Sequence, residues 1–134
     1  MIVDVTAAAV NFTDVLVVEN RYQMSATLPF VPGSEFAGVV RTVGADVDGL
    51  RPGQRVSGIT FVGAFAERVR VPAAQVQVVP DGIALETAAA WAVVYRTGYH
   101  ALRSAARVQP GETVAVLGAG GGVGLAAVEL ATIL

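Results

Sequence analysis

Cysteine is absent from the 134 residues of the sequence, which excludes disulfide bonds and thiolate chemistry. The absence also removes the softest zinc ligand that proteins use. Lysine is absent as well: all nine basic residues are arginine, and they form no basic stripe of the kind that binds nucleic acid. We therefore expect no nucleic-acid partner, and a chain without cysteine fits a reducing, cytoplasmic location.

Charge is scarce and apolar residues are abundant, at 15% and 54% of the chain, which argues against disorder. The stretch 114–134 is long enough to span a bilayer and contains Glu129 as its only charge. It also holds five glycines within seven residues, which would weaken a helix. The N-terminus has no basic flank and carries Asp4 inside its apolar stretch, so it is a poor signal peptide. We expect no membrane segment, and a membrane-anchored protein remains an alternative interpretation.

The first two-thirds of the chain has the pattern of short strands separated by turns. Val3 and Val5 alternate with polar residues, and the β-branched stretch 36–44 ends at a glycine. Segment 68–71 alternates arginine with valine, and segment 75–80 alternates glutamine with valine. Short strands at this spacing favour a small barrel or sandwich.

The pattern changes near residue 83. Residues 83–108 have helical periodicity, with Gly98 as a break or a close-packing point. An apolar strand over 113–117, a glycine cluster and a second helix follow, which is the beginning of a βαβ unit. An apolar strand of this kind needs a parallel neighbour, and no later strand follows. We therefore expect the C-terminal part to be a fragment of a larger sheet.

The glycine cluster has the spacing Ala119-x-Gly121-x-x-Gly124 between the expected strand and helix. This is a dinucleotide-binding fingerprint with alanine in its first position, and it places a pyrophosphate against the N–H groups of Gly121, Gly122 and Val123. In a simpler interpretation, the glycines only pack the helix onto the sheet. The residue that would contact the ribose, about 20 positions further on, lies beyond the sequence.

Four motifs in order extend this interpretation: VNFTDVLVVENRYQ (10–23), LPFVPGSEFAGVV (28–40), YRTGYHAL (95–102) and LGAGGGVG (117–124). Together they resemble the medium-chain dehydrogenase/reductase superfamily, and within it the zinc-free, zeta-crystallin-like NADPH:quinone oxidoreductases. The resemblance implies a mixed α/β protein. Residues 1–95 would form part of a GroES-like β-barrel catalytic domain, and residues 96–134 helices and the first βα unit of a truncated Rossmann cofactor domain.

Zinc-dependent members of the superfamily hold their catalytic metal with Cys, His and Cys. The matching positions here carry Asn11, Ser34 and Val93, which would ligate zinc poorly, so we expect no metal. Without a Lewis acid, alcohol oxidation is disfavoured, and hydride addition to an electrophilic acceptor is the easier reaction. The resemblance thus implies hydride transfer from NADPH, or NADH, to a quinone or enone. It also matches Glu35 to a glutamate near the floor of the active site.

The resemblance implies roles for individual residues. Asn11 would donate a hydrogen bond to a developing enolate-like oxygen, and Asp14 would orient its neighbours. Tyr22 would lie over the nicotinamide and the acceptor, and Thr97 would face the nicotinamide ring. For each of these residues a turn-fixing or packing role is the alternative, and for the single histidine, His100, we expect packing rather than catalysis.

A non-catalytic interpretation also fits the sequence: a GroES-like fragment or remnant that serves only as a binding or oligomerising module. The motif residues favour descent from an enzyme without distinguishing an enzyme from such a remnant. We expect the isolated 134-residue chain to have little or no activity, because most of the cofactor domain would lie outside it. We expect a homo-oligomer, since the unpaired strand would expose an edge.

Overall fold

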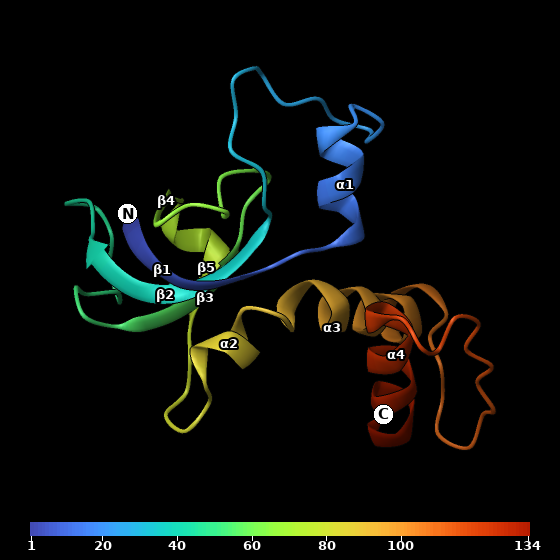
Figure 1. Ribbon diagram of the computed structural model, residues 1–134. Helices are drawn as coiled ribbons and strands as arrows, with labels where there is room; N and C mark the ends of the chain where they lie inside the picture. Colours follow the sequence, from blue (N-terminus) through green and yellow to red (C-terminus); the bar gives the residue numbers. More distant parts are fainter. The chain divides into compact units, whose positions relative to one another are not determined.

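An antiparallel sheet of five short strands, in the order β4-β1-β2-β3-β5, organises the N-terminal part of the protein (Figure 1). The computed structural model describes residues 1–134, and the chain divides into two compact units, Met1–Ala90 and Trp91–Leu134. The strands are β1 (Ile2–Ala9), β2 (Glu35–Thr42), β3 (Arg55–Ile59), β4 (Arg68–Arg70) and β5 (Val76–Val78).

Valine side chains and one phenylalanine fill the main core of the first unit. The buried members of this core come from four of the strands and the chain beside them: Val3, Phe36, Val40, Val56, Ala64, Val69 and Val71. A smaller cluster, Ala37, Val79, Ala88 and Ala89, lies where α2 (Leu85–Ala88) packs on the sheet. The period-2 pattern of a half-buried strand is clear on β4, where one buried residue lies between two exposed ones, whereas consecutive residues of β2 and β3 are buried.

The central strands β1 and β2 approach each other very closely at Gly38. A Cβ atom built on Gly38 would lie 2.0 Å from the carbonyl oxygen of Asp4 on β1. Only glycine fits such a contact between two backbones. Gly38 therefore fixes the spacing of the two strands that lead into the candidate site.

The strands expected at the N-terminus, over 36–44, over 68–71 and over 75–80 are confirmed as β1, β2, β4 and β5. On β4 the expected alternation holds: Val69 is buried and both flanking arginines are exposed. The sequence pattern missed β3. Its middle residues, Ser57 and Gly58, are both buried, so the strand shows no polar–apolar alternation.

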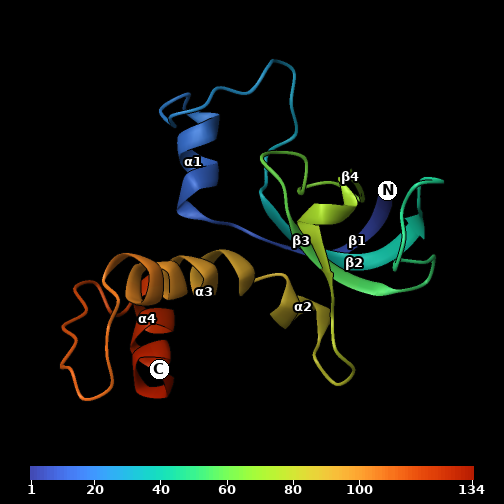
Figure 2. The same cartoon turned by 180° about the vertical axis from the view of Figure 1, so that it is seen from behind.

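Helices make up the second unit: α3 (Ala92–Tyr99), a π-helical turn η2 (His100–Ala105) and α4 (Gly122–Ile133). The helical pattern over 83–108 is broken between α2 and α3, not at Gly98. Gly98 is buried and is a close-packing point, since a Cβ there would lie 3.3 Å from Leu130 and 3.4 Å from Ala127 on α4. Seen from behind, α3 and α4 remain side by side (Figure 2).

The expected strand over 113–117 is wrong. This segment pairs with no other strand, and its residues alternate between half-buried and exposed, with Leu117 95% exposed. The physical reason is the missing neighbour, because a strand exists only through hydrogen bonds to an adjacent one. The chain in this region instead runs past α4 and enters the glycine loop.

The structure also bears on the expected fold class and on the membrane segment weighed for residues 114–134. The combination of an antiparallel sheet with helices confirms the mixed α/β class. None of the helices combines the length and apolar character needed to cross a bilayer; α4, the helix in the stretch 114–134, has 12 residues.

Candidate functional site

Three neighbouring strands, β1, β2 and β3, begin or end on the same side of the sheet, which we call the polar edge because several polar residues lie along it. Ala9 at the end of β1 pairs with Glu35 at the start of β2, and Glu35 pairs with Ile59 at the end of β3. The residues just beyond these strand ends therefore lie near one another, although they are far apart in sequence. Asn11, Ser34 and Phe61 all occupy such positions.

Asn11 is held in place from two directions. Its side-chain Nδ2 donates to Oε2 of Glu35 at 3.1 Å, and its backbone N–H donates to Oδ2 of Asp14 at 2.8 Å. Glu35 is 1% exposed and Asp14 is 5% exposed, so both acceptors are shielded from water. Hydrogen bonds of this kind to carboxylates are shorter and stronger than those between neutral groups.

Asp14 stands in the first turn of α1 (Phe12–Val18), three residues after Asn11, the residue that precedes the helix. Its carboxylate satisfies a backbone donor at the helix N-terminus, where negative charge is favourable. The sequence folds this way locally because an aspartate at this position can reach back to the residue before the helix. Asp14 thus fixes the backbone at Asn11, and its orienting role in a reaction stays a prediction.

Ser34 adds a polar atom without a hydrogen-bond partner. Its Oγ is buried and neither donates nor accepts a hydrogen bond. The backbone oxygen of Ser34, in contrast, accepts from the N–H of Thr60 at 2.8 Å. The groups at this edge that could ligate a metal are an amide, a hydroxyl and carboxylates. Nowhere in the chain do three or more His, Asp or Glu side chains gather as metal ligands. Zinc sites in proteins include thiolate sulfur or imidazole nitrogen among their ligands, with carboxylates only beside them, and neither of those two groups is present here, so this ligand set does not fit zinc.

An aromatic pair lies beside this edge. Tyr22 stacks with Phe61 at a centroid distance of 6.4 Å and an interplanar angle of 29°. Tyr22 is positioned by the turn that ends α1: Asn20 has a positive φ of 53°, and the N–H of Tyr22 donates to the carbonyl of Leu16 at 3.2 Å. Asparagine tolerates this left-handed conformation better than most residues.

In the second unit, the glycine loop leads directly into α4. A Cβ at Gly124 would lie 2.2 Å from the carbonyl oxygen of Gly118, so the helix start and the loop can pack only through glycine here. Around Gly120 no atom lies within 4 Å of a built Cβ, and Ala119, Gly121, Gly122 and Val123 are exposed. No side chain accepts from the first turn of α4, which leaves the N–H groups of Gly122 and Val123 available to an anion. The N–H of Gly121, expected to join them, instead donates to the carbonyl oxygen of Gly118 at 3.0 Å.

Thr97 lies on the exposed side of α3, and its hydroxyl donates to the carbonyl oxygen of Val93 at 2.7 Å. The oxygen of that hydroxyl still has lone pairs that can accept a hydrogen bond. His100, expected to be a packing residue, is exposed at the start of η2. Val93, one of the three positions compared with zinc ligands, provides its backbone oxygen to Thr97.

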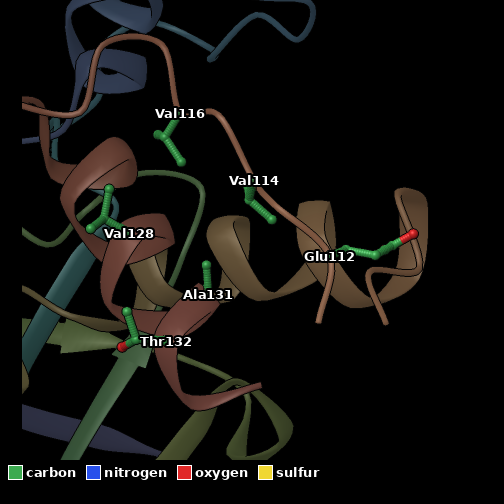
Figure 3. A pocket seen from close by; sticks show the side chains of 6 residues that line it. All are labelled: Glu112, Val114, Val116, Val128, Ala131 and Thr132. Carbon is green, nitrogen blue, oxygen red and sulfur yellow. The ribbon is translucent and has the colours of Figure 1, made fainter. Parts of the chain in front are cut away.

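A pocket of about 310 Å³ also lies in the second unit (Figure 3). Glu112, Val114 and Val116 line it from the segment before the glycine loop, and Val128, Ala131 and Thr132 from α4. Its walls combine aliphatic side chains with Glu112 and Thr132, and none of the expected site residues lies in it. We therefore attribute it to the packing of this segment on α4.

The structure thus brings Asn11, Asp14 and Tyr22 into the first unit, and Thr97 with the glycine-loop residues into the second. Sequence reasoning missed Phe61 and the unpartnered hydroxyl of Ser34. The stretch RVSGITF could have indicated Phe61 only if its first five residues had been identified as a strand that pairs with β2. Nothing in the sequence pattern marks Ser34 as lacking a hydrogen-bond partner.

Comparisons with known proteins place these features in context. Residues 1–81 match the family model described as the alcohol dehydrogenase GroES-like domain. The chain is 42% identical over 130 residues to the quinone oxidoreductase-like protein 2 of Rattus norvegicus, covering 97% of this chain and 37% of that protein.

Two solved structures extend the likeness to the fold. A probable oxidoreductase from Mycobacterium abscessus matches with a TM-score of 0.91 and 42% identity, over 98% of this chain and 42% of the other. The quinone oxidoreductase of Thermus thermophilus, solved also as its complex with NADPH, matches with a TM-score of 0.85 and 36% identity, over 98% of this chain and 40% of the other. The expected GroES-like fold is confirmed, and the chain spans well under half the length of these relatives.

Proposed function

Because the chain belongs to the medium-chain dehydrogenase/reductase superfamily and carries its GroES-like domain, we propose that the whole protein is a zinc-independent quinone or enone reductase. Membership of this superfamily indicates an oxidoreductase. What we add as a proposal is that the enzyme reduces its substrate, that the substrate is a quinone or an enone, and which cofactor it uses. The observation that carries it is the amide of Asn11, held by Glu35 at the edge where three strands meet.

Asn11 has the chemistry needed at an acceptor oxygen. One N–H of its side-chain amide is used by Glu35, and the second can donate to another oxygen. When hydride adds to a conjugated carbonyl or a quinone, negative charge develops on an oxygen. A donor already fixed by a buried partner stabilises that charge without having to reorient. Asn11 is therefore the residue we propose to contact the acceptor oxygen.

The surroundings of Asn11 favour this reaction over alcohol oxidation. The amide and hydroxyl at positions 11 and 34 do not supply the ligands that a catalytic zinc requires. A quinone or enone is already electrophilic and needs only positioning and polarisation from the protein. Tyr22, beside this edge, is proposed to cover the acceptor, and Asp14 to hold the backbone of Asn11.

For the cofactor we propose NADPH, with NADH as the alternative to be tested. The bound nicotinamide would supply the hydride. The open backbone near Gly121, with the free N–H groups of Gly122 and Val123 at the start of α4, fits a pyrophosphate. Ala119 and Gly124 would shape that loop, and the hydroxyl of Thr97 would face the nicotinamide. The NADPH complex of the relative from Thermus thermophilus supports this choice.

The test is an assay of the whole protein with NADPH or NADH and with 1,4-naphthoquinone or 3-penten-2-one as acceptor. We expect cofactor oxidation that continues in the presence of a metal chelator. Replacing Asn11 by alanine should lower kcat by about 100-fold, the usual effect of removing one donor to a developing oxyanion. Thr13→Ala, on the same helix, is the matched control and should leave kcat within about twofold.

Two results would contradict the proposal. An unchanged kcat in Asn11→Ala would show that the amide of Asn11 does not stabilise the developing charge. A whole protein that oxidises neither cofactor with either acceptor would instead support a non-catalytic binding or oligomerising module. The 134-residue chain alone should show little activity. Light scattering of the whole protein tests the expected homo-oligomer separately, since the unpaired strand that motivated it does not form over residues 113–117.

A further inference from the structure

Phe61 takes no part in the proposed reaction, yet it lies at the same polar edge as Asn11. It follows β3 by two residues, and Ile59 at the end of β3 pairs with Glu35, the partner of Asn11. Asn11 follows β1 by two residues in the same way, since Ala9 also pairs with Glu35. Because β1 and β3 flank β2, Asn11 and Phe61 leave the sheet at positions roughly 10 Å apart.

The loop that carries Phe61 is tied to the loop that precedes β2. Four backbone hydrogen bonds join residues 60–65 to residues 31–34: Thr60 to Ser34 at 2.8 Å, Gly63 to Val31 at 2.8 Å, Ala64 to Gly33 at 3.0 Å and Phe65 to Pro32 at 3.0 Å. These bonds limit the freedom of the loop. The ring of Phe61 is therefore presented from a constrained backbone.

Tyr22 reaches this ring from a third segment. The two rings stack at 6.4 Å with an angle of 29° between their planes, and both side chains are half-buried. A stacked pair of this kind leaves faces and edges that can contact a further flat ring. Both rings carry few rotatable bonds, so little conformational entropy is lost when a third ring adds to them.

We propose that Tyr22 and Phe61 form an aromatic wall that selects acceptors with a planar ring, such as naphthoquinones, over open-chain enones. The inference rests on the proposed function, since it names the substrate class of the same site. A planar quinone can stack on the wall while one of its oxygens accepts from the amide of Asn11. An open-chain enone can make the hydrogen bond but has no ring to stack, so it gains only the bond.

The test compares kcat/KM for 1,4-naphthoquinone with kcat/KM for 3-penten-2-one in the whole protein. Phe61→Leu, which keeps an apolar side chain but removes the ring, should lower the ratio of the two values by about three- to tenfold. Phe61→Tyr, which keeps the ring, should preserve the ratio within about twofold. Phe65→Leu is the matched control: Phe65 lies in the same loop but covers Gly33, and its replacement should also preserve the ratio.

A binding measurement separates the wall from the reaction. Titration of 1,4-naphthoquinone, followed by NMR, should shift the ring resonances of Tyr22 and Phe61, and Phe61→Leu should weaken binding by about three- to tenfold. Such binding without any turnover would support the wall and refute the proposed function. Turnover with a ratio that Phe61→Leu leaves unchanged would refute the wall and leave the proposed function standing.

Discussion

Asn11 and Glu35 form the polar contact on which the candidate site depends, and its strength can be measured. We expect Asn11→Ala to lower the free energy of unfolding by about 1–3 kcal/mol, because the buried carboxyl of Glu35 loses a hydrogen-bond donor. A double-mutant cycle with Glu35→Ala should give a coupling energy of about 1 kcal/mol or more, measured by denaturant unfolding. Additive effects of the two substitutions would show that the contact contributes nothing.

Gly38 is the second residue whose identity the structure fixes. Gly38→Ala should destabilise the protein by about 3 kcal/mol or more, because the added methyl group would lie 2.0 Å from the backbone oxygen of Asp4. Gly44→Ala is the matched control, since the nearest atom to its built Cβ is 3.9 Å away. Urea unfolding of both variants checks the difference. Equal stabilities would contradict the close approach of β1 and β2.

At the scale of elements, Asp4 links three strands through its carboxylate. Arg41 on β2 donates at 2.8 Å and Arg68 on β4 donates at 3.1 Å to the same Oδ1 atom. The hydrogen bond from Arg41 is the largest cause that holds the pKa of Asp4 below its ordinary value of 3.8, and Arg68 adds to it. These links stabilise the folded state above pH 3.8, and their contribution is lost as the pH falls through the lowered pKa.

An NMR titration of the Asp4 carboxyl carbon tests this arrangement. In the unmodified chain the midpoint should lie below 3.8. Arg41→Gln should raise it, and Arg68→Gln should raise it by less, following the order of the two hydrogen bonds. A larger effect of Arg68→Gln would show that Arg68, and not Arg41, is the main cause of the lowered pKa of Asp4.

Tyr95 provides a similar link between α3 and α4 in the second unit. Its hydroxyl donates to the carboxylate of Glu129, and this hydrogen bond raises the pKa of Tyr95 above 10.0. The contribution to stability is therefore present below pH 10.0 and is lost as the pH rises through the higher folded pKa.

The pKa of Tyr95 can be followed by the absorbance of tyrosinate during an alkaline titration, when the curve is compared with that of a variant without the accepting carboxylate. With three tyrosines in the chain, Tyr95 should ionise at a higher pH than in the variant Glu129→Gln. The variant should lower the pKa of Tyr95 because the accepting carboxylate is gone. An identical titration curve for the two proteins would show that the pair does not form in solution.

Local patterns sufficed for the elements that have one buried and one exposed face. Strand β4 was predictable because its valine and its arginines point to opposite faces. Strand β3 was not, since its neighbouring residues Ser57 and Gly58 are both buried. The segment 113–117 has the composition of a strand, but a strand also requires a partner, and composition does not provide one.

The candidate site follows the same division. Asn11, Asp14 and Tyr22 could be named from a motif because they lie within 12 consecutive residues of the chain. Phe61 could not, because its place depends on the register of β2 with β3, which no local pattern encodes. The contact of Asn11 with Glu35 joins residues 24 positions apart, and it likewise depends on a register, that of β1 with β2.

At the scale of the whole molecule, the division into two units makes a prediction about folding. Residues 1–90 contain the complete sheet and both of its hydrophobic clusters. A fragment of these residues should therefore fold by itself and keep the amide chemical shifts of β1, β2 and β3 found in the 134-residue chain. Its NMR spectrum checks this, and loss of chemical-shift dispersion would mean that the sheet needs the second unit.

The antiparallel course of β2 and β3 has a practical consequence. Both strands meet the polar edge at Glu35 and Ile59, so the connection between them, residues 43–54, turns at the opposite edge of the sheet. An affinity peptide or a fluorescent label inserted near Asp48 and Gly49 would be far from the residues that we propose to handle the acceptor. The protein thus offers a point of attachment for immobilisation or optical detection that leaves its chemistry undisturbed.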